Sequence, residues 1–299
     1  MAFDSGIYAG ARVTISSMLL ANRAMRIEFA ILDGGVTTYQ KAEIQRIVDS
    51  FDSCSIRWIK FDRSRVSDLV SHQEFTHMTY ARILLPELVE ADSCIYIDAD
   101  FLVMSDMREF CQNDPDTLMA AALDGDGTSV GEYPWHKGHV DSPFVNTGLM
   151  WMNLDQWRKQ NLSHEILKFL EVESARCRSA DQNALNWILR DRIKVMEGRF
   201  NAMANEIDNG TKSLIPGTTN IHYASGMKPW KRPLPTLSHA AWRHFNSRHR
   251  GIEANIEWSM SSLAKYFIYC FKTEKKVSPL NSSARDSLQI YKGYLDRHS

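Results

Sequence analysis

The order of hydrophobic and polar positions predicts alternating strands and helices. A short apolar run at residues 27–32 ends at the turn sequence DGG, which is typical of a buried strand. In the segment that follows, Thr37 and Gln40 have the spacing of a capping box, which marks the start of a helix. Apolar residues then recur three and four positions apart, at Ile44, Ile47, Val48 and Phe51. We therefore expect a helix with one buried face.

Further apolar runs continue this succession. They predict strands at 55–61, 94–97, 118–123, 149–153 and 193–196. They predict helices at 79–89, 155–172 and 180–190. Strands and helices in this order favour an α/β domain with a mostly parallel, mixed central sheet that is covered on both faces. Ligands of such sheets bind beyond the carboxyl ends of the strands.

The composition excludes several classes of protein. The chain has 299 residues, of which 44% are hydrophobic and 24% charged, enough for one large domain or two modest ones. Its net charge of -1, without an arginine-rich stripe interleaved with aromatics, argues against nucleic acid as a partner. The five cysteines are scattered and form no CxxC pair, which predicts neither a disulfide framework nor a structural zinc site. This usage favours a reducing, cytoplasmic compartment.

The two ends of the chain differ in character. The N-terminus lacks the features of a signal peptide, and no apolar stretch approaches the roughly 18 residues of a spanning helix. After the proline-containing connector KRPLPTL, residues 236–299 form a basic and aromatic tail, which we separate from a catalytic domain at 1–235. The stretch WSMSSLAKYFIYCFKTEKK in this tail fits a membrane interface beside anionic lipid. It also fits a helix packed on the domain with a solvated lysine end.

The strand at 94–97 ends at two aspartates. Asp98 and Asp100 are two positions apart, so on a continuing strand their side chains would point to the same face. Carboxylates held this close repel each other unless a cation lies between them, and oxygen ligands suit magnesium, manganese or calcium. The alternative is a pair of solvated aspartates in a turn.

The stretch IHYASGMKPW supplies further candidate ligands. The imidazole of His222, added to two carboxylates, would shift the preferred metal from magnesium toward manganese. Gly226 permits a close approach of the backbone, and Lys228 offers a positive charge for a phosphate oxygen. A purely structural role for the histidine is the alternative.

Several motifs then resemble one enzyme family. The stretches TYARILLPEL, IYIDADFLVM, FVNTGLMWMNL, SADQNALN, GRFNAM and HYASGMKPW occur in the order and approximate spacing of the family-eight retaining glycosyltransferases. That family includes bacterial lipopolysaccharide galactosyl- and glucosyltransferases and glycogenin. The resemblance covers residues 2–230 and implies a Rossmann-like, nucleotide-sugar-binding fold of glycosyltransferase A type.

The resemblance also implies roles for individual residues. The ligands of manganese, or of magnesium in its place, would be Asp98, Asp100 and His222. Contacts to the uridine, the ribose and the diphosphate would come from Ala2, Asp4, Tyr8, Ala99, Ser225, Gly226 and Lys228. The residues around the donor hexose would be Arg82, Asp124, Asn146, Asp181 and Gln182, of which Asp181 and Gln182 are the catalytic candidates. For Gln182 the sequence leaves a second role open, because with Ser179 it has the spacing of a capping box.

The implied activity is transfer of galactose or glucose from a UDP-sugar to a glycan hydroxyl, as in lipopolysaccharide or another surface glycan. Loops at 125–143 and 204–219 are predicted to form the acceptor platform. Double displacement would need a carboxylate nucleophile, whereas the family has an amide at Gln182, so front-face attack is favoured. The chain has only residues 1–3 before Asp4, where the family has a full strand. We therefore expect either that the true start codon lies upstream or that the uridine site is damaged. The alternatives are a non-catalytic sugar-nucleotide- or glycan-binding protein and a metal-dependent nucleotide-sugar hydrolase.

Overall fold

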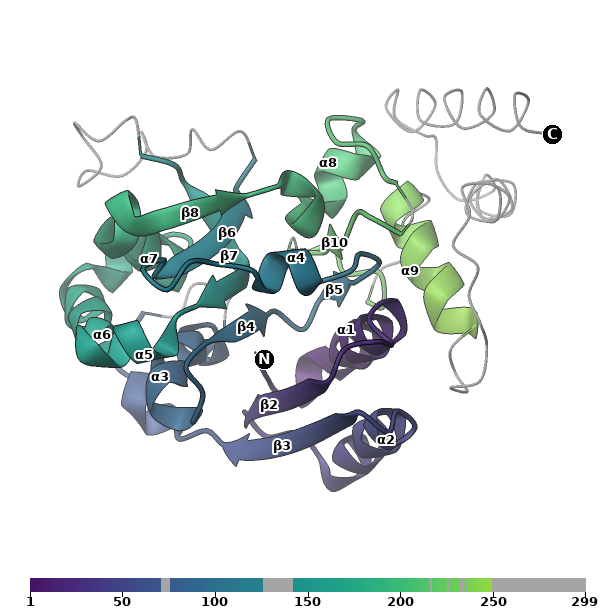
Figure 1. The fold of residues 1–299 in the computed structure, drawn as a ribbon, viewed down its shortest axis with the longest axis horizontal. Helices are drawn as coiled ribbons and strands as arrows, with labels where there is room; N and C mark the ends of the chain where they lie inside the picture. The colour runs from purple at the N-terminus through teal and green to yellow at the C-terminus, as the bar shows by residue number, and fades with distance from the viewer. Residues whose placement is uncertain are drawn as a thin grey trace.

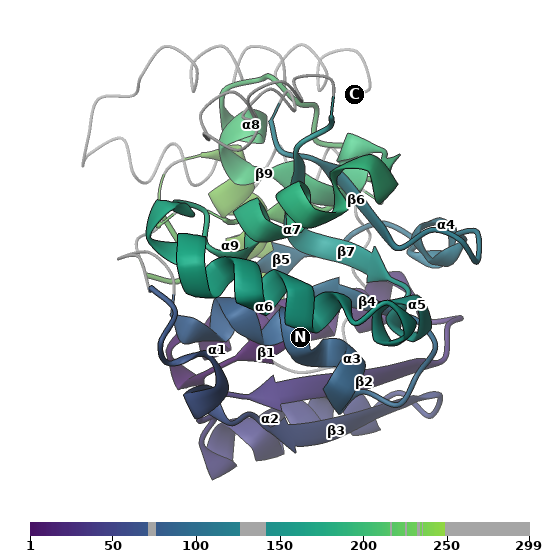
Figure 2. The same cartoon turned by 90° about the vertical axis from the view of Figure 1, so that its left-hand side faces the viewer.

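The computed structural model describes residues 1–70, 76–125, 142–215, 217–224, 226–231, 234 and 236–248. Helices lie on both sides of its strands (Figure 1). α1 (Tyr8–Ala21) and α2 (Thr38–Asp49) cover one side, while α6 (Leu162–Glu173) and α7 (Asp181–Leu189) cover the other (Figure 2). The predicted α/β architecture, covered on both faces, is confirmed.

Parallel and antiparallel strands both occur. The first group is parallel and consists of β1 (Ala2–Phe3), β2 (Ile27–Asp33) and β3 (Cys54–Lys60). The second group has the order β4 (Cys94–Ile97), β7 (Val145–Met152), β6 (Met119–Leu123) and β8 (Ile193–Met196). In this group β7 is antiparallel to β4 and β6, while β8 is parallel to β6. The sheet is therefore mixed, as predicted.

A small third group of strands joins distant parts of the sequence. It has the order β5 (Phe101–Leu102), β10 (Ile221–His222) and β9 (Ala202–Met203). In the antiparallel pair of β10 and β5, His222 is the partner of Phe101. This register brings His222 beside the turn that follows β4.

Side chains of the same strands enter different hydrophobic clusters because successive residues point to opposite faces. Tyr96 and Met150 belong to the cluster on the side of α6 and α7. Ile97 and Leu149, their immediate neighbours in sequence, belong to the cluster on the side of α1 and α2. Polar residues of the site lie at the end of β4 and in the first half of β7.

The helices differ from the expected ones in two places. The capping box at Thr37 and Gln40 is present and starts α2. The single helix predicted at 155–172 is divided into α5 (Leu154–Lys159) and α6, because Asn161 between them has a φ of 52°. The helix predicted at 79–89 is mostly a 3-10 helix, η3 (His77–Leu84), followed by α3 (Leu85–Leu88) with Pro86 in its first turn.

Part of the predicted tail is a packed helix. α9 (Leu237–Arg248) buries Leu237, Trp242 and Phe245 against α8 (Ala204–Asp208) and α1. Asp208 caps it by accepting hydrogen bonds from the backbone and hydroxyl of Ser238 at 2.9 and 2.7 Å. Residues 249–299, with the predicted membrane-interface segment, lie outside the described residues. Among the helices that the structure describes, none has both the length and the apolar character needed to cross a membrane.

Two further short elements complete the description. The first strand, β1, has two residues, and Ala2 and Phe3 pair in parallel with Leu32 and Asp33 of β2. The short helix α4 (Arg108–Cys111) follows β5. Despite its length, β1 delivers Asp4 to the same edge of the sheet as the end of β4.

Candidate active site

A cavity of about 540 Å³ lies at the edge where β1, β4 and β6 end. Its volume is in the range of small-molecule sites. Predicted site residues that line it are Ala2, Asp4, Arg82, Asp98, Ala99, Asp100, Asp124, Asn146, Asp181, Gln182, His222 and Lys228. Tyr8 and Gly226 are not among its lining residues, and Ser225 lies outside the described residues. The fold thus brings together side chains from across more than two hundred positions of the chain.

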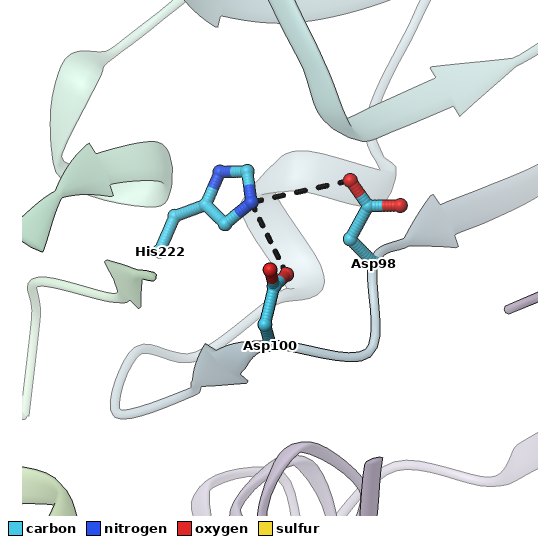
Figure 3. Close-up of side chains that lie close together, drawn as sticks. All are labelled: Asp98, Asp100 and His222. Atoms are coloured by element: carbon cyan, nitrogen blue, oxygen red, sulfur yellow. Dashed lines mark ion pairs between the residues drawn. The ribbon is translucent and has the colours of Figure 1, made fainter. Parts of the chain in front are cut away.

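Two carboxylates and an imidazole converge in this cavity. β4 ends at Ile97, so Asp98 and Asp100 occupy a turn rather than a continuing strand. Both side chains nevertheless face His222 (Figure 3). The Nε2 atom of His222 is 3.2 Å from Oδ1 of Asp100 and 3.9 Å from Oδ2 of Asp98. One ligand atom from each residue lies within 4.8 Å of the others, an arrangement able to hold a metal ion.

Gly148 makes room for this arrangement. A Cβ at this position would lie 2.2 Å from Cε1 of His222 and 3.0 Å from Oδ2 of Asp98. The backbone of Gly148 also accepts a hydrogen bond from the N–H of Asp98 at 2.7 Å. Only a residue without a side chain lets β7 approach the histidine and the first aspartate this closely.

Asp100 is more buried than Asp98, and its two carboxylate oxygens have different environments. Its Oδ2 is 2.5 Å from Nζ of Lys228. Its Oδ1 is buried and receives no hydrogen bond from the protein. Burial alone would raise the pKa of Asp100, but His222, when its ring is protonated, and Lys228 outweigh burial and hold the pKa below its usual value. The carboxylate is therefore ionised, with one oxygen turned toward the imidazole.

Arg82 connects Asp98 to Asp181. Its guanidinium lies 3.0 Å from Oδ1 of Asp98 and 3.0 Å from Oδ2 of Asp181. It also lies over the ring of Tyr96, whose hydroxyl donates to Oδ1 of Asp98 at 2.7 Å. Burial lowers the pKa of Arg82, but Asp181 and Asp98 more than offset it, so the pKa is raised. With Oδ1 of Asp98 held in this way, its Oδ2 is left facing His222.

Asp181 is the first residue of α7 and is 1% exposed. It accepts a hydrogen bond from the hydroxyl of Thr79 at 2.7 Å. Burial raises the pKa of Asp181 to about 6, although Arg82 and Thr79 act in the opposite direction. Near neutral pH the carboxylate is thus ionised and paired with Arg82.

Gln182 belongs to the cavity and not to a helix cap. The capping box predicted for Ser179 and Gln182 is wrong, because the N–H of Ser179 bonds to Oδ1 of Asn183 instead. The amide oxygen of Gln182 accepts from the side chain of Asn146 at 3.2 Å and from the N–H of Thr147 at 3.1 Å. Its Nε2 donates to Asp124 at 2.7 Å. The side chain of Gln182 therefore bonds to residues that are distant in sequence and not to the backbone of Ser179.

Asp4 lies at the opposite end of the cavity. It caps the short 3-10 helix η1 (Ser5–Ile7) by accepting from the N–H of Gly6 at 2.9 Å. Its other carboxylate oxygen is 3.5 Å from Arg63. Tyr8 starts α1 and packs against the adjoining hydrophobic cluster.

Other residues of the site received no role from the sequence. Tyr96 stands two positions before Asp98, and the alternation of a strand would have placed both side chains on one face. Asn201 occurs in the quoted motif GRFNAM, and its Oδ1 lies 3.0 Å from Nδ1 of His222. Thr79 has no local signal, because its contact with Asp181 spans 102 positions.

The sequence matches a family and several curated proteins. The model of the family described as glycosyl transferase family 8 matches residues 1–233. General stress protein A of Bacillus subtilis is 24% identical over 242 residues, which are 72% of this chain and 80% of that protein. Lipopolysaccharide 1,3-galactosyltransferase of Salmonella typhimurium is 22% identical over 244 residues, which are 76% of this chain and 71% of that protein.

The structure matches a solved glycosyltransferase. The galactosyltransferase LgtC, crystallised with donor and acceptor sugar analogues, superimposes with a TM-score of 0.74 at 20% identity. The match covers 86% of this chain and 96% of that chain. This likeness shows a shared fold, and the predicted glycosyltransferase A type is confirmed.

Proposed function

The chain belongs to glycosyl transferase family 8, and on this premise we propose that it moves galactose or glucose from a UDP-sugar to a glycan hydroxyl with retention of configuration. The observation that carries the proposal is the convergence of Asp98, Asp100 and His222 in a cavity lined by polar side chains. The family supports the general activity. The donor, the cation and the acceptor are our inference from the chemistry of the cavity.

The chemistry of the three ligands suits a divalent cation. Oδ1 of Asp100 is buried without a hydrogen-bond donor among the described residues, and the missing side chain of Gly148 lets His222 and Asp98 pack closely against β7. Two carboxylates with one imidazole favour manganese over magnesium, which prefers oxygen ligands alone. When bound, such a cation neutralises the negative charge of a departing diphosphate.

The rest of the cavity suits a sugar nucleotide. We assign Ala2, Asp4 and Tyr8 to the uridine and Ala99 to the ribose. We assign the diphosphate to Lys228 with Ser225 and Gly226, since the ammonium of Lys228 already lies at the cation site. The donor hexose would contact Arg82, Asp124, Asn146, Asp181 and Gln182, whose carboxylates, amides and guanidinium match the donors and acceptors of sugar hydroxyls.

The arrangement of Gln182 favours attack from the front face. Its amide oxygen already accepts hydrogen bonds from the side chain of Asn146 and from the N–H and hydroxyl of Thr147, so this oxygen is poorly placed to act as a nucleophile. Asp181 is ion-paired with Arg82. We therefore propose that the acceptor oxygen bonds to the anomeric carbon as the bond to the phosphate oxygen breaks. The hydroxyl proton passes to that phosphate oxygen, and Lys228 stabilises the charge that develops on it.

The acceptor is proposed to be lipopolysaccharide or another surface glycan. A lipopolysaccharide galactosyltransferase among the relatives supports this class. We propose that the enzyme works in the cytoplasm, with a catalytic domain at 1–235 and a tail at 236–299 that attaches it peripherally to the membrane. Deletion of residues 252–299, which leaves α9 intact, should release the protein from membrane fractions and preserve turnover of a soluble acceptor. Unchanged membrane association of the shortened protein would contradict the role of the tail.

One assay tests the proposed activity. The purified protein is incubated with Mn²⁺ and either UDP-galactose or UDP-glucose, with and without a truncated lipooligosaccharide. We expect acceptor-dependent release of UDP, a labelled oligosaccharide product, and loss of both when the cation is chelated. Equal UDP release without acceptor would indicate a nucleotide-sugar hydrolase. Binding of the UDP-sugar without any turnover would indicate a binding protein.

A further inference from the structure

We infer that Asn201 is a positioning residue that keeps the proton of His222 on Nδ1, so that the lone pair of Nε2 faces the cation site. The inference rests on the proposed cation-dependent transfer. Asn201 is the last residue of the 3-10 helix η8 (Gly198–Asn201) and is fully buried. Its Oδ1 lies 3.0 Å from Nδ1 of His222.

The ring of His222 has a fixed position. It is 2% exposed and stacks on the ring of Phe101, with centroids 4.2 Å apart and planes at 16°. In this position Nδ1 faces Asn201 and Nε2 faces Oδ1 of Asp100. The neutral ring carries one proton, on either Nδ1 or Nε2, and the nitrogen without the proton can bind a metal ion.

Backbone groups of β7 decide the orientation of the neighbouring amides. The N–H of Gly148 can only donate, and it donates to Oδ1 of Asn146 at 2.9 Å. The same oxygen accepts from Nδ2 of Asn201 at 2.9 Å. The reversed amide would place the oxygen of Asn201 against the oxygen of Asn146. Asn201 therefore presents its oxygen to His222, and Nδ1 of His222 must be the donor.

The other end of this amide chain is fixed in the same way. Gln182 accepts from the N–H of Thr147 at 3.1 Å, so its oxygen faces β7 and Nδ2 of Asn146 donates to it at 3.2 Å. Two backbone donors on β7 thus set the direction of hydrogen bonds through three side-chain amides to the imidazole. In the neutral ring with its proton on Nδ1, Nε2 of His222 is an acceptor 3.2 Å from Oδ1 of Asp100, and that oxygen accepts no hydrogen bond from the described residues. Nε2 of His222 and Oδ1 of Asp100 are thus both suitable ligands for a cation.

Loss of the Asn201 oxygen would undo this arrangement. With no acceptor at Nδ1, the proton can move to Nε2 and bond to Oδ1 of Asp100, only 3.2 Å away. Both atoms would then be lost as metal ligands. Removal of such a supporting partner typically lowers metal affinity 10- to 100-fold.

The test measures the tautomer directly. Protein labelled with ¹⁵N-histidine is studied by long-range ¹H–¹⁵N correlation in the alkaline range, where imidazole rings are neutral, and His222→Asn assigns the signal. We expect an Nδ1–H tautomer in the unsubstituted protein and an Nε2–H tautomer in Asn201→Leu. We also expect Asn201→Leu to bind Mn²⁺ alone 10- to 100-fold more weakly. Asn201→Asp, which keeps an acceptor toward Nδ1, should retain the Nδ1–H tautomer.

Asn22→Leu is the matched control. Asn22 is another buried asparagine, and it bonds to the backbone of Met18, Ser105 and Met107 far from the histidine in sequence. Its replacement should leave the His222 tautomer unchanged even where it lowers stability. An Nε2–H tautomer in the unsubstituted protein would overturn the inference without any variant having to fold. Failure of sugar transfer with the expected tautomer would count against the proposed function alone.

Discussion

The ammonium group of Lys228 lies 2.5 Å from Oδ2 of Asp100, so the turn after β10 neutralises one of the carboxylates that face His222. The same ammonium donates to the carbonyl of Tyr223. A divalent cation bound to Asp100 would lie close to this positive charge and be repelled by it. The negatively charged diphosphate of a sugar-nucleotide donor would attract both the cation and the ammonium of Lys228. Lys228 is therefore expected to oppose binding of the free cation and to favour transfer.

Lys228→Met separates these two effects. We expect about tenfold tighter binding of Mn²⁺ alone, because one nearby positive charge is removed. We expect turnover to fall roughly a hundredfold, because a charge that stabilises the leaving diphosphate is lost. Calorimetric titration with Mn²⁺ and the rate of UDP release measure the two quantities. Lys212→Met, which removes a lysine paired with Glu206 at 2.8 Å, is the control. Weaker Mn²⁺ binding by Lys228→Met would contradict the account.

Asp98→Asn should abolish measurable transfer. The amide cannot replace the charged ligand, so the reaction loses several kcal/mol of charge stabilisation, or roughly a thousandfold in rate. Tyr96→Phe is the control, because it removes only one hydrogen bond to Oδ1 of Asp98 and leaves Arg82 in place. A loss of about 1 kcal/mol, roughly fivefold in rate, is expected for it. Initial rates with saturating donor distinguish the two, and equal losses would show that Tyr96 rather than the charge of Asp98 sets the activity.

Gly148→Ala tests the space around the histidine. The added methyl would lie 2.2 Å from Cε1 of His222, so the ring or β7 must move. We expect Mn²⁺ affinity to fall at least tenfold, because the three ligands no longer converge. Gly198→Ala is the control, since the nearest atom to its added Cβ is 3.5 Å away. Titration with Mn²⁺ measures the affinity of both variants. Unchanged affinity in Gly148→Ala would show that the close approach of Gly148 to His222 is not needed for cation binding.

The strands of the sheet were largely predictable from the sequence. Those at 94–97 and 193–196 coincide with β4 and β8, because each is a short run of mostly apolar residues that is followed by a charged one. The break at Asn161 was missed, since a left-handed residue leaves the helical spacing of apolar residues intact on both sides. α1 was missed because residues on most of its faces are buried, which leaves no amphipathic pattern to read.

The site was predictable at the level of motifs and not of contacts. The acidic pair stood out because nothing charged precedes it in its strand. His222 was a candidate ligand from its own stretch of sequence, and the family resemblance then favoured this role over a purely structural one. The role of Asn201 follows from a tertiary contact, because its hydrogen bond to Asn146 spans 55 positions. Tyr96 bonds to Asp98 only two positions away, a contact that the alternation of a strand could have indicated. The capping box left open for Gln182 is absent because Thr147 on β7 and Asp124, just after β6, bond to its side chain in place of the local backbone.

Gln182→Ala distinguishes front-face attack from double displacement. If the amide only orients the donor, its removal should lower the rate roughly ten- to hundredfold and leave measurable transfer with the same anomeric product. Gln45→Ala, which alters a glutamine bonded only to Asp49, is the control. Mass spectrometry of the enzyme after rapid quenching should show no hexose attached. A hexose trapped on Gln182 or Asp181 would establish double displacement instead.

The buried carboxyl of Asp181 predicts how stability changes with pH. Burial raises its pKa from 3.8 to about 6, so the folded protein holds the neutral form more firmly than the unfolded chain does. The stability that this group contributes is therefore complete below pH 3.8 and is lost as the pH rises through about 6. A shift of this size corresponds to about 3 kcal/mol.

Comparison with Asp181→Asn isolates this contribution, because the amide keeps an acceptor for Thr79 and does not titrate. Between pH 4 and pH 6, the free energy of unfolding of the unsubstituted protein should fall relative to that of the variant, and then level off. Urea unfolding at half-unit steps of pH measures the difference, with Asp52→Asn as an exposed control. A difference that grows in favour of the unsubstituted protein would mean that the attraction of Arg82, 3.0 Å away, exceeds the cost of burying the charge. The slope of stability with pH thus decides which of these two opposing effects controls the protonation of Asp181.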